Sequence, residues 1–273
     1  MALTKVLIAV KTYPSLSTKY DELVCTAGFT EDGQWIRIYP VPFRKLDFEG
    51  QYKKWQWIEI DLEKNTSDFR PESFKTTKLE SIKVLGKVDR EDNWFERKKL
   101  TLNKVYDNLD LLIAEAKDKK IGTSLAVLKP KEILDFVIEA VDINWDKNKI
   151  ASILAKQEQI SLFDIEESKK VFEVVRKVPY KFSYKFITED NKERTIMIED
   201  WEIGQLYWNC FDKYKDEKIA CKKVREKYYD TFLKKNELYF FMGTTLKFHN
   251  VGINPFLIIG VFYPPKDNKI SLF

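Results

Sequence analysis

The sequence has little histidine, cysteine and glycine, and each shortage excludes a kind of site. Its 273 residues include one histidine, three cysteines and nine glycines. Cys25, Cys210 and Cys221 lie far apart and form no Cys-x-x-Cys pair, which argues against a zinc ribbon and a disulfide framework and favours a reducing compartment. No dinucleotide fingerprint, glycine-rich phosphate loop or acyl-transfer elbow occurs. The sequence therefore names no reaction through its motifs.

Long apolar runs and a strong net charge are also missing. No segment approaches 18 uninterrupted apolar residues, and the apolar run near the N-terminus is too short for a signal peptide. We therefore expect no membrane span, no export and a cytoplasmic location. The 47 Lys and Arg residues exceed the 43 Asp and Glu residues by only four, so a basic surface requires local clustering.

The first 150 residues show mainly strand patterns. The segments ELVCTAGF and QWIRIYPVP flank TEDG, which is a hairpin signal because Gly33 can take the positive φ that such a loop needs. Apolar side chains alternate along residues 56–64, as in a half-buried strand. Residues 102–120 change to helical spacing. These patterns predict a mixed α+β unit that ends near residue 150.

A second unit follows a polar stretch. The segments YKFSYKFI and RTIMIE bracket TEDNKE as a second hairpin, two helical patterns follow, and two dense apolar strands end at a pair of prolines. We therefore predict an α+β protein of two mixed domains, each a mainly antiparallel sheet with packed helices. The predicted parts are an N-terminal domain (1–150), a polar linker (151–172), a C-terminal domain (173–264) and a C-terminal tail (265–273).

Two short segments share the sequence Ile-Ser-Leu-Phe. QISLF resembles the peptide with which bacterial DNA polymerases, mismatch-repair and other replication-associated proteins bind the β sliding clamp. That pattern is Gln, an aliphatic residue, Ser or Asp, Leu, then Phe or Leu, and it is matched at all five positions by Gln159, Ile160, Ser161, Leu162 and Phe163. The terminal KISLF matches through Ile270, Ser271, Leu272 and Phe273 and departs at Lys269. The resemblance covers ten residues, and no family is recognised for the two domains.

The residue types of this peptide suit a clamp pocket. Leu162 and Phe163 offer large apolar anchors, and the amide of Gln159 offers a polar head that fixes register. Two weak copies on one chain would gain from effective concentration if both bound one ring. The alternative is that both copies are docking elements that pack on the protein's own domains.

Basic and aromatic residues concentrate between residues 35 and 70. Flat rings beside cations suit unpaired bases and phosphates, as in sheet-based binders of single strands. The alternative is a sheet whose second face is covered by a helix, with the cations at its rim. We expect a nucleic-acid-binding face, with single-stranded DNA as one candidate ligand, formed by Arg37, Tyr39, Arg44, Lys53, Trp55 and Arg70.

Candidate catalytic residues have no diagnostic spacing. Glu59 and Asp61 share a strand face, and Asp200 precedes a helix, where an N-cap is the simpler interpretation. His249 has no Ser or Cys beside it in the sequence. These four residues are weak catalytic candidates. No metal site is assigned and no cofactor is evident, although a nuclease would use Mg²⁺.

These features favour a bacterial or phage-type DNA-transaction protein that acts in replication, repair or phage defence. We expect the sliding clamp to recruit it through QISLF, and the basic, aromatic face to contact DNA. Two alternatives stay open. One is a nucleic-acid-processing enzyme, either a metal-dependent nuclease or a nucleotide-modifying enzyme, whose site assembles only in three dimensions. The other is a two-domain scaffold in which the ISLF segments are docking elements.

Overall fold

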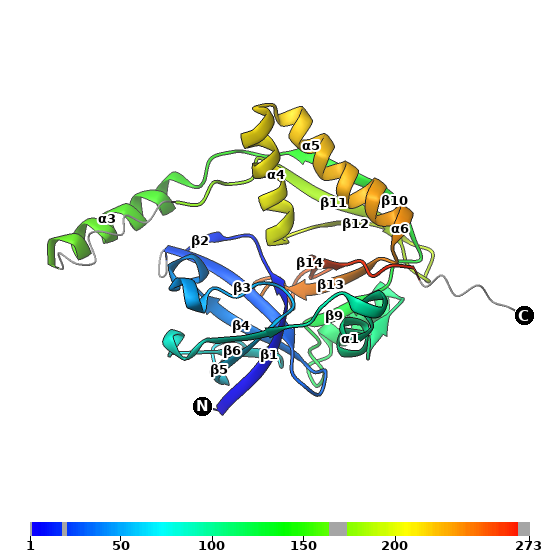
Figure 1. The fold of residues 1–273 in the computed structure, drawn as a ribbon, viewed down its shortest axis with the longest axis horizontal. Coiled ribbons are helices and arrows are strands. Elements are labelled where there is room, and N and C mark those ends of the chain that lie inside the picture. Colours follow the sequence, from blue (N-terminus) through cyan, green and yellow to red (C-terminus); the bar gives the residue numbers. More distant parts are fainter. Residues whose placement is uncertain (1, 18–20, 164–173, 267–273) are drawn as a thin grey trace, which may run out of the picture.

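The computed structural model describes residues 2–17, 21–163 and 174–266, and for residues 156–163 it describes the backbone alone. These parts form three layers (Figure 1). A small barrel of N-terminal strands lies on one side, a four-stranded sheet lies in the middle, and a three-stranded sheet with helices lies on the other side.

The N-terminal strands close into a barrel. They are β1 (Ala2–Lys11), β2 (Ser15–Ser17), β3 (Asp21–Phe29), β4 (Trp35–Val41), β5 (Gln56–Lys64), β6 (Ser73–Lys75) and β7 (Lys83–Lys87). β1 pairs with both β3 and β5, β3 pairs with β4, and β6 joins β4 to β5, so the pairings return to β1. β2 and β7 extend this sheet beside β3 and β5.

Both faces of β1 are buried. Val6 and Ile8 point into the barrel, which is also filled by apolar side chains of β4 and β5. Leu7 and Ala9, on the other face of β1, pack against the middle sheet. A strand covered on both sides reads as a continuous apolar run, which explains why KVLIAV shows no alternation.

Short helical turns connect the barrel strands, and one helix follows them. The 3₁₀ turns are η1 (Phe43–Lys45), η2 (Phe48–Gly50) and η3 (Leu79–Ser81), and the helix is α1 (Glu91–Thr101). The backbone at Asp92, Asn93 and Trp94 is left-handed, with φ values of 46°, 52° and 64°. Left-handed backbone is costly for residues other than glycine, so this turn needs support from its surroundings.

The middle sheet is buried on both faces. Its order is β14 (Phe256–Phe262), β13 (Tyr239–Thr244), β9 (Leu125–Leu128) and β8 (Val105–Tyr106), and only the β8–β9 pair is parallel. On β13, Tyr239 and Phe241 face the barrel, whereas Phe240 and Met242 face the third layer. Alternating large side chains therefore join the two outer layers through one sheet.

The third layer is a three-stranded antiparallel sheet with helices. Its strands are β10 (Glu132–Ala140), β11 (Tyr180–Ile187) and β12 (Glu193–Met197). The helical elements are α2 (Leu109–Lys117), α4 (Trp201–Tyr214), α5 (Glu217–Arg225), the π-helical turn η5 (Glu226–Thr231) and α6 (Phe232–Lys235). Side chains of α4, α5, η5 and α6 share one apolar core with this sheet. The amphipathic face of α4 thus places the start of that helix next to the barrel, where Trp201 packs against Phe43.

Helix α3 (Lys147–Phe163) projects away from all three layers (Figure 1). Its first half is anchored where Ile153 packs with Leu16 and Val175. The sequence indicated a linker over residues 151–172, but its first part continues this helix to Phe163, because the polar composition of the segment does not interrupt helical hydrogen bonding. The remaining linker residues lie outside the described part of the chain.

The α+β prediction is confirmed. The hairpin around Gly33 forms between β3 and β4, with φ of 78° at the glycine, and the second hairpin forms between β11 and β12. Strands on opposite sides of residue 150 pair with each other, β10 with β11 and β9 with β13. Among the helices of the described residues, none combines the length and hydrophobicity that crossing a bilayer requires.

Candidate functional site

The six residues of the predicted nucleic-acid-binding face do not share one surface. Arg37, Tyr39 and Arg70 line one pocket, and Lys53 and Trp55 line another. Arg44 lies apart from both pockets and forms an ion pair of 2.7 Å with Glu22.

The expected exposure of three of these residues is wrong. Arg37 is 2%, Arg70 4% and Trp55 8% exposed. The alternation of side chains along the barrel strands correctly predicted which residues face the barrel interior and which face outward. The outward face is covered as well, by the middle sheet and by the loops beside the barrel. Exposure of the second face was an assumption that the sequence could not test.

The larger pocket, which we call the apolar cavity, has a volume of about 610 Å³. It lies where the barrel, the middle sheet and the third layer meet, and most of its lining atoms are apolar. Its polar lining residues include Tyr13, Cys25, Arg37, Arg70, Glu199 and Thr245. A concave apolar site with a few convergent polar groups is the usual form of a small-molecule pocket.

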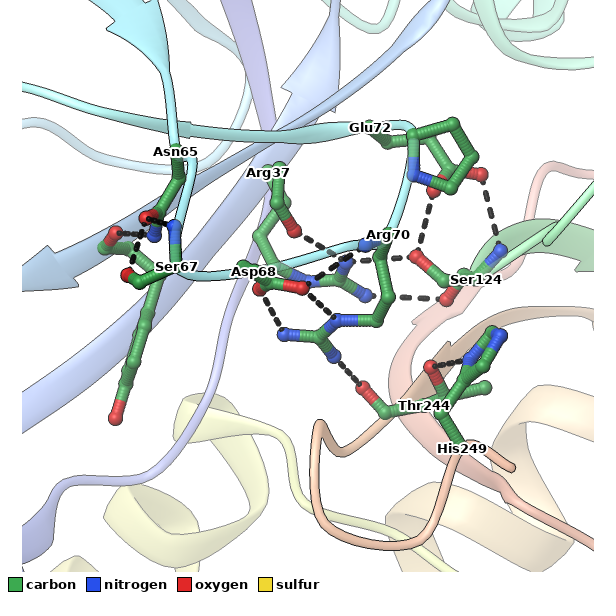
Figure 2. Close-up of polar contacts among 12 residues, drawn as sticks. Arg37, Asn65, Ser67, Asp68, Arg70, Glu72, Ser124, Thr244 and His249 are labelled. Atoms are coloured by element: carbon green, nitrogen blue, oxygen red, sulfur yellow. Dashed lines mark hydrogen bonds and ion pairs between the residues drawn. The ribbon is translucent and has the colours of Figure 1, made fainter. Parts of the chain in front are cut away.

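The arginines of the apolar cavity are held by hydrogen bonds within the protein (Figure 2). Arg37 donates to the hydroxyl and the carbonyl of Ser124 at 2.7 and 3.1 Å, and Glu72 accepts from the Ser124 hydroxyl at 2.6 Å. Arg70 donates to both carboxylate oxygens of Asp68, at 2.8 and 2.5 Å, and to the carbonyl of Thr244. Both guanidinium groups therefore have acceptors already.

Two groups in the apolar cavity lack such partners. The pKa of the Glu199 carboxyl is raised by burial, and no hydrogen bond or ion pair to its side chain occurs among the described residues. The hydroxyl of Thr245 is buried without a hydrogen-bond partner in the same part of the chain. Burial also raises the pKa of the Cys25 thiol, which favours its neutral form. A carboxyl in such surroundings can act as a proton donor or acceptor toward a ligand.

The second pocket, which we call the basic pocket, has a volume of about 270 Å³. Among the described residues that line it, six are cationic and one, Glu202, is anionic. The cationic residues are Lys11, Lys53, Lys54, Lys87, Arg90 and Arg97, and the aromatic ones are Trp55, Trp94, Trp201 and Tyr263. Aromatic and cationic side chains thus gather here, as the sequence suggested for this region, but in a pocket instead of on an open face.

Three cations form the buried floor of the basic pocket. Arg97 is fully buried, and the side chains of Lys11 and Lys54 are almost so. Lys54 is neutralised by Asp200, at 2.9 and 2.8 Å, and by Glu202 at 3.4 Å. Burial opposes its charge, but these carboxylates outweigh that effect, so the pKa of Lys54 lies above its ordinary value.

Lys11 and Arg97 have no such neutralisation. Lys11 donates to the carbonyl of Tyr52 at 3.1 Å, and its ammonium lies 4.0 and 4.9 Å from the ring centroids of Phe43 and Trp201. Burial, together with the charge of Lys54, lowers the pKa of Lys11 to about 8. Neither Lys11 nor Arg97 forms an ion pair with a described carboxylate.

Arg97 is held between two indole rings. Its guanidinium carbon lies 4.5 Å from the Trp55 centroid and 4.9 Å from the Trp94 centroid, and the group donates twice to the carbonyl of Val88, at 3.0 and 2.6 Å. Its Nη1 atom is buried without a hydrogen-bond partner among the described residues. Burial and the nearby Arg90 lower the pKa of Arg97 to about 10.

The backbone around the basic pocket is unusual at both tryptophans. Trp55 has a φ of 68° and exchanges backbone hydrogen bonds with Ile8 and Val88, at 2.6 and 2.8 Å. Trp94 lies in the left-handed turn that opens α1. Left-handed conformations of bulky residues are rare and are found most often where a site must be held in shape. This turn places the Trp94 ring beside the Arg97 guanidinium, whose other indole neighbour is Trp55.

A thin wall separates the two pockets. Thr12 and Tyr13 face the apolar cavity, whereas Lys11, just before them on the chain, faces the basic pocket. Asp200 lines the apolar cavity, binds Lys54 of the basic pocket and accepts a hydrogen bond of 3.1 Å from the backbone of Glu202. The N-cap interpretation of Asp200 is confirmed, since it caps α4 while buried in an ion pair.

The other catalytic candidates are not brought together. Glu59 and Asp61 lie on one side of β5 and face Lys83 and Lys78, each at 3.8 Å. His249 is buried, with its Nδ1 atom 2.8 Å from the hydroxyl of Thr244. Within the described ranges, no group of three or more His, Cys, Asp and Glu side chains has the arrangement of a metal site.

The clamp-type peptide can be placed only in part. Residues 159–163 form the last five positions of α3, and their side chains lie outside the description. The terminal copy, with Ile270, Leu272 and Phe273, lies outside the described residues. The resemblance to clamp-binding peptides therefore stays a prediction.

Sequence reasoning missed most of the lining residues of the basic pocket, including Lys11, Lys87, Arg90, Trp94 and Arg97. The segment DREDNWFERKK does mix cations with aromatic residues, as does QYKKWQW. That shared composition was the available signal. The pairing of β7 with β5, which brings the two segments together, could not be read from either segment alone.

Family comparisons divide the chain close to the junction between the barrel and the rest. A family model described as the domain of unknown function DUF8758 matches residues 2–103, and one described as the domain of unknown function DUF8757 matches residues 105–273. The second match covers more than half of the chain, which therefore belongs to the DUF8757 family. No curated protein matches the chain.

Proposed function

We propose that the protein binds nucleic acid through the basic pocket and its rim, and that a sliding clamp recruits it to DNA during replication, repair or phage defence. The observation that carries the binding proposal is the charge of the basic pocket, where six cations meet one lining carboxylate in a chain whose formal net charge is only +4. Phosphate neutralisation by clustered cations supplies most of the affinity in nucleic-acid binding.

The rim of the pocket supports an extended anionic ligand. Lys53, Lys87 and Arg90 are exposed, whereas the floor cations are buried. Arg90 lies over the Trp94 ring, 5.1 Å from its centroid, and because that ring is only 7% exposed, the rim offers its cations to a ligand. A flexible single strand can bring successive phosphates to separate cations around the pocket, so it suits the rim better than a stiff duplex.

Binding of fluorescent oligonucleotides tests this proposal. We expect the protein to bind a single strand at low salt more tightly than the duplex of the same sequence, as measured by fluorescence anisotropy. Lys87→Gln should weaken binding, whereas Lys83→Gln is the matched control, because Lys83 lies on the same strand outside the pocket. Preference for an acidic peptide such as polyglutamate over every oligonucleotide would overturn the nucleic-acid assignment.

The clamp-recruitment proposal is supported by the sequence match and by the course of α3. The helix carries residues 159–163 away from the three layers, while Ile153 anchors its first half (Figure 1). A 17-residue helix is about 25 Å long. Because α3 points away from the three layers, its last five residues lie at the end of the helix that is far from them (Figure 1). A binding peptide at this position would leave both pockets free for other ligands.

Calorimetry with a purified bacterial sliding clamp tests recruitment. We expect the intact protein to bind, the double variant Leu162→Ala and Phe163→Ala to lose binding, and removal of residues 269–273 to weaken it only if the second copy contributes. Leu154→Ala is a matched control, because Leu154 is an exposed apolar residue of the same helix outside the peptide. No heat of binding with intact protein would favour the scaffold alternative, in which both copies are docking elements.

A second candidate function belongs to the apolar cavity. Its unpartnered Glu199 carboxyl favours an organic ligand with hydrogen-bond donors, as expected if the protein is a nucleotide-modifying enzyme. Saturation-transfer NMR with a panel of nucleosides would test this. Signals that disappear in Glu199→Gln would support a site in the cavity, and a panel without signals would remove the support for nucleosides.

A further inference from the structure

We infer that the floor of the basic pocket binds the terminal phosphate monoester of a nucleic-acid strand, while the rim contacts the phosphates that follow. This inference rests on the proposed function and specifies which phosphate the pocket takes. It depends on three observations: the charge left on the floor, the division into floor and rim, and the missing partner of Arg97.

The charge of the basic pocket matches a phosphate dianion. On the floor, the three cations Lys11, Lys54 and Arg97 meet the two carboxylates of Asp200 and Glu202, which leaves a net charge of +1, and neither Lys11 nor Arg97 forms an ion pair with a described carboxylate. The exposed cations of the rim, Lys53, Lys87 and Arg90, add to this charge. Burying a charge without its own counter-ion is costly, so a pocket with this excess of cations is suited to a ligand that carries two negative charges. A terminal monoester carries close to two charges at neutral pH, whereas an internal diester carries one.

The geometry of the pocket favours the end of a strand. Its walls are the rings of Trp55, Trp94, Trp201 and Tyr263, and its volume of about 270 Å³ is small for a bound ligand. A terminal phosphate needs one opening, because the chain leaves it in one direction only. An internal phosphate has chain on both sides and would need two openings or would stay at the rim.

Arg97 supplies a donor that has no use within the protein. Its Nε and Nη2 atoms donate to the carbonyl of Val88, and the two indoles fix the plane of the guanidinium. Its Nη1 remains without a partner although it is buried. Guanidinium groups donate to phosphate oxygens, so a phosphate oxygen that reaches Nη1 would accept the missing hydrogen bond.

The titration of the two partners predicts a pH optimum for binding. The monoester gains its second charge above about pH 6. Lys11 loses its proton above about pH 8, in the combined field of Lys53, Lys54, Asp200 and Glu202 and beside the rings of Phe43 and Trp201. Affinity for a phosphorylated end should therefore be greatest between about pH 6 and pH 8 and fall on both sides. A bound dianion stabilises the charged form of Lys11, so it would move the upper end of this pH range to a higher pH.

The experiment compares one single-stranded sequence with three kinds of ends. One oligonucleotide carries a 5′-phosphate, one a 3′-phosphate and one hydroxyl groups at both ends, with the fluorophore at the end not under test. Fluorescence anisotropy at a fixed salt concentration should show one phosphorylated strand bound at least about tenfold more tightly than the hydroxyl strand, since charge-assisted hydrogen bonds to a buried floor are lost with the phosphate. The better of the two phosphorylated strands identifies the end that enters.

Variants separate the floor from the rim. Lys11→Met removes one floor charge at similar length and should abolish the preference for the phosphorylated strand while retaining most affinity for the hydroxyl strand. Arg97→Lys keeps the charge but loses the planar donors, and should reduce the preference. Lys83→Gln serves as the control outside the pocket, and this variant should keep the full preference for the phosphorylated strand.

Three outcomes would overturn the inference. Equal affinity for all three strands would contradict it while leaving nucleic-acid binding intact. A nucleoside monophosphate that binds as tightly as the phosphorylated strand would show that the strand contributes nothing. Failure of every oligonucleotide to bind would reject the inference together with the proposed function.

Discussion

The two pockets differ in what surrounds their buried cations. In the apolar cavity, Arg70 forms a two-pronged ion pair with Asp68, and Arg37 donates to Ser124, which in turn is held by Glu72 (Figure 2). In the basic pocket, Lys11 and Arg97 have no carboxylate partner among the described residues. In the first arrangement Asp68 compensates the charge of Arg70, so the loss of either partner would leave a buried charge unpaired. The second costs stability, and a cost of that kind is expected where a ligand supplies the missing charge.

The largest expected effect comes from breaking the compensated pair. Arg70→Met leaves the Asp68 carboxylate buried without its cation, so we expect a loss of about 3–5 kcal/mol in the free energy of unfolding. Urea unfolding followed by circular dichroism measures it. Arg97→Met is the matched variant in the basic pocket. Its free energy of unfolding should fall by less than that of Arg70→Met, because the substitution removes a buried charge that has no carboxylate partner among the described residues. Equal losses of unfolding free energy in Arg70→Met and Arg97→Met would contradict the proposed difference between a paired and an unpaired buried cation.

The next effect has the opposite sign. Lys11→Met should raise the free energy of unfolding at pH 7 by about 2 kcal/mol, because it removes a buried charge whose pKa is lowered to about 8 and loses one hydrogen bond to Tyr52. An unfolded lysine binds its proton up to about pH 10.4, so between pH 8 and that value the unfolded state binds more protons and the wild-type protein gains stability as pH rises. The advantage of the variant should therefore be full below pH 8 and decline above it.

Unfolding midpoints of Lys11→Met at pH 7 and pH 9.5 test that sign. A variant that is less stable than the wild type at pH 7 would show that Lys11 contributes to the fold as Arg70 does. In that case, the charge of Lys11 would not be a cost to the fold that a ligand has to offset.

The smallest effect concerns the apolar cavity. Burial raises the pKa of Glu199, so the folded protein holds a proton that the unfolded chain releases, and stability should fall as pH rises through the folded pKa. Glu199→Gln should therefore be more stable than the wild type at pH 7, by under about 1 kcal/mol, and equal to it at pH 4. Thermal unfolding at the two pH values measures the difference. A variant that is less stable at pH 7 would indicate a partner for the Glu199 carboxylate.

Local patterns in the sequence predicted much of the fold. The turn chemistry at Gly33 and the alternation along residues 56–64 depend on neighbours in the chain, and both appear as expected in the barrel. The N-cap at Asp200 is local as well. The closure of the barrel, by contrast, depends on β1 pairing with β5, between residues 50 to 60 positions apart in the chain, and neither strand contains a signal for the other.

The candidate site was predicted only in its composition. The mixture of cations and tryptophans around Lys53 and Trp55 indicated phosphate and base contacts, and these two residues do line the basic pocket. Arg37 and Arg70 have the same residue type but are held by acceptors that come from distant segments, Ser124 and Thr244. Which arginine is compensated depends on tertiary pairing, so sequence composition alone cannot separate a structural cation from one that is available to a ligand.

The most direct test of this account is the salt dependence of oligonucleotide binding by the wild type and by the double variant Lys53→Gln and Lys87→Gln. The account predicts that affinity of the wild type falls linearly on a log–log plot of binding constant against salt, and that the double variant reduces the slope by about 1.4, since each contact to a single strand contributes about 0.7. Lys83→Gln should leave the slope unchanged, because Lys83 does not line the pocket. Identical slopes for the wild type and the double variant would contradict the claim that the basic pocket and its rim bind nucleic acid.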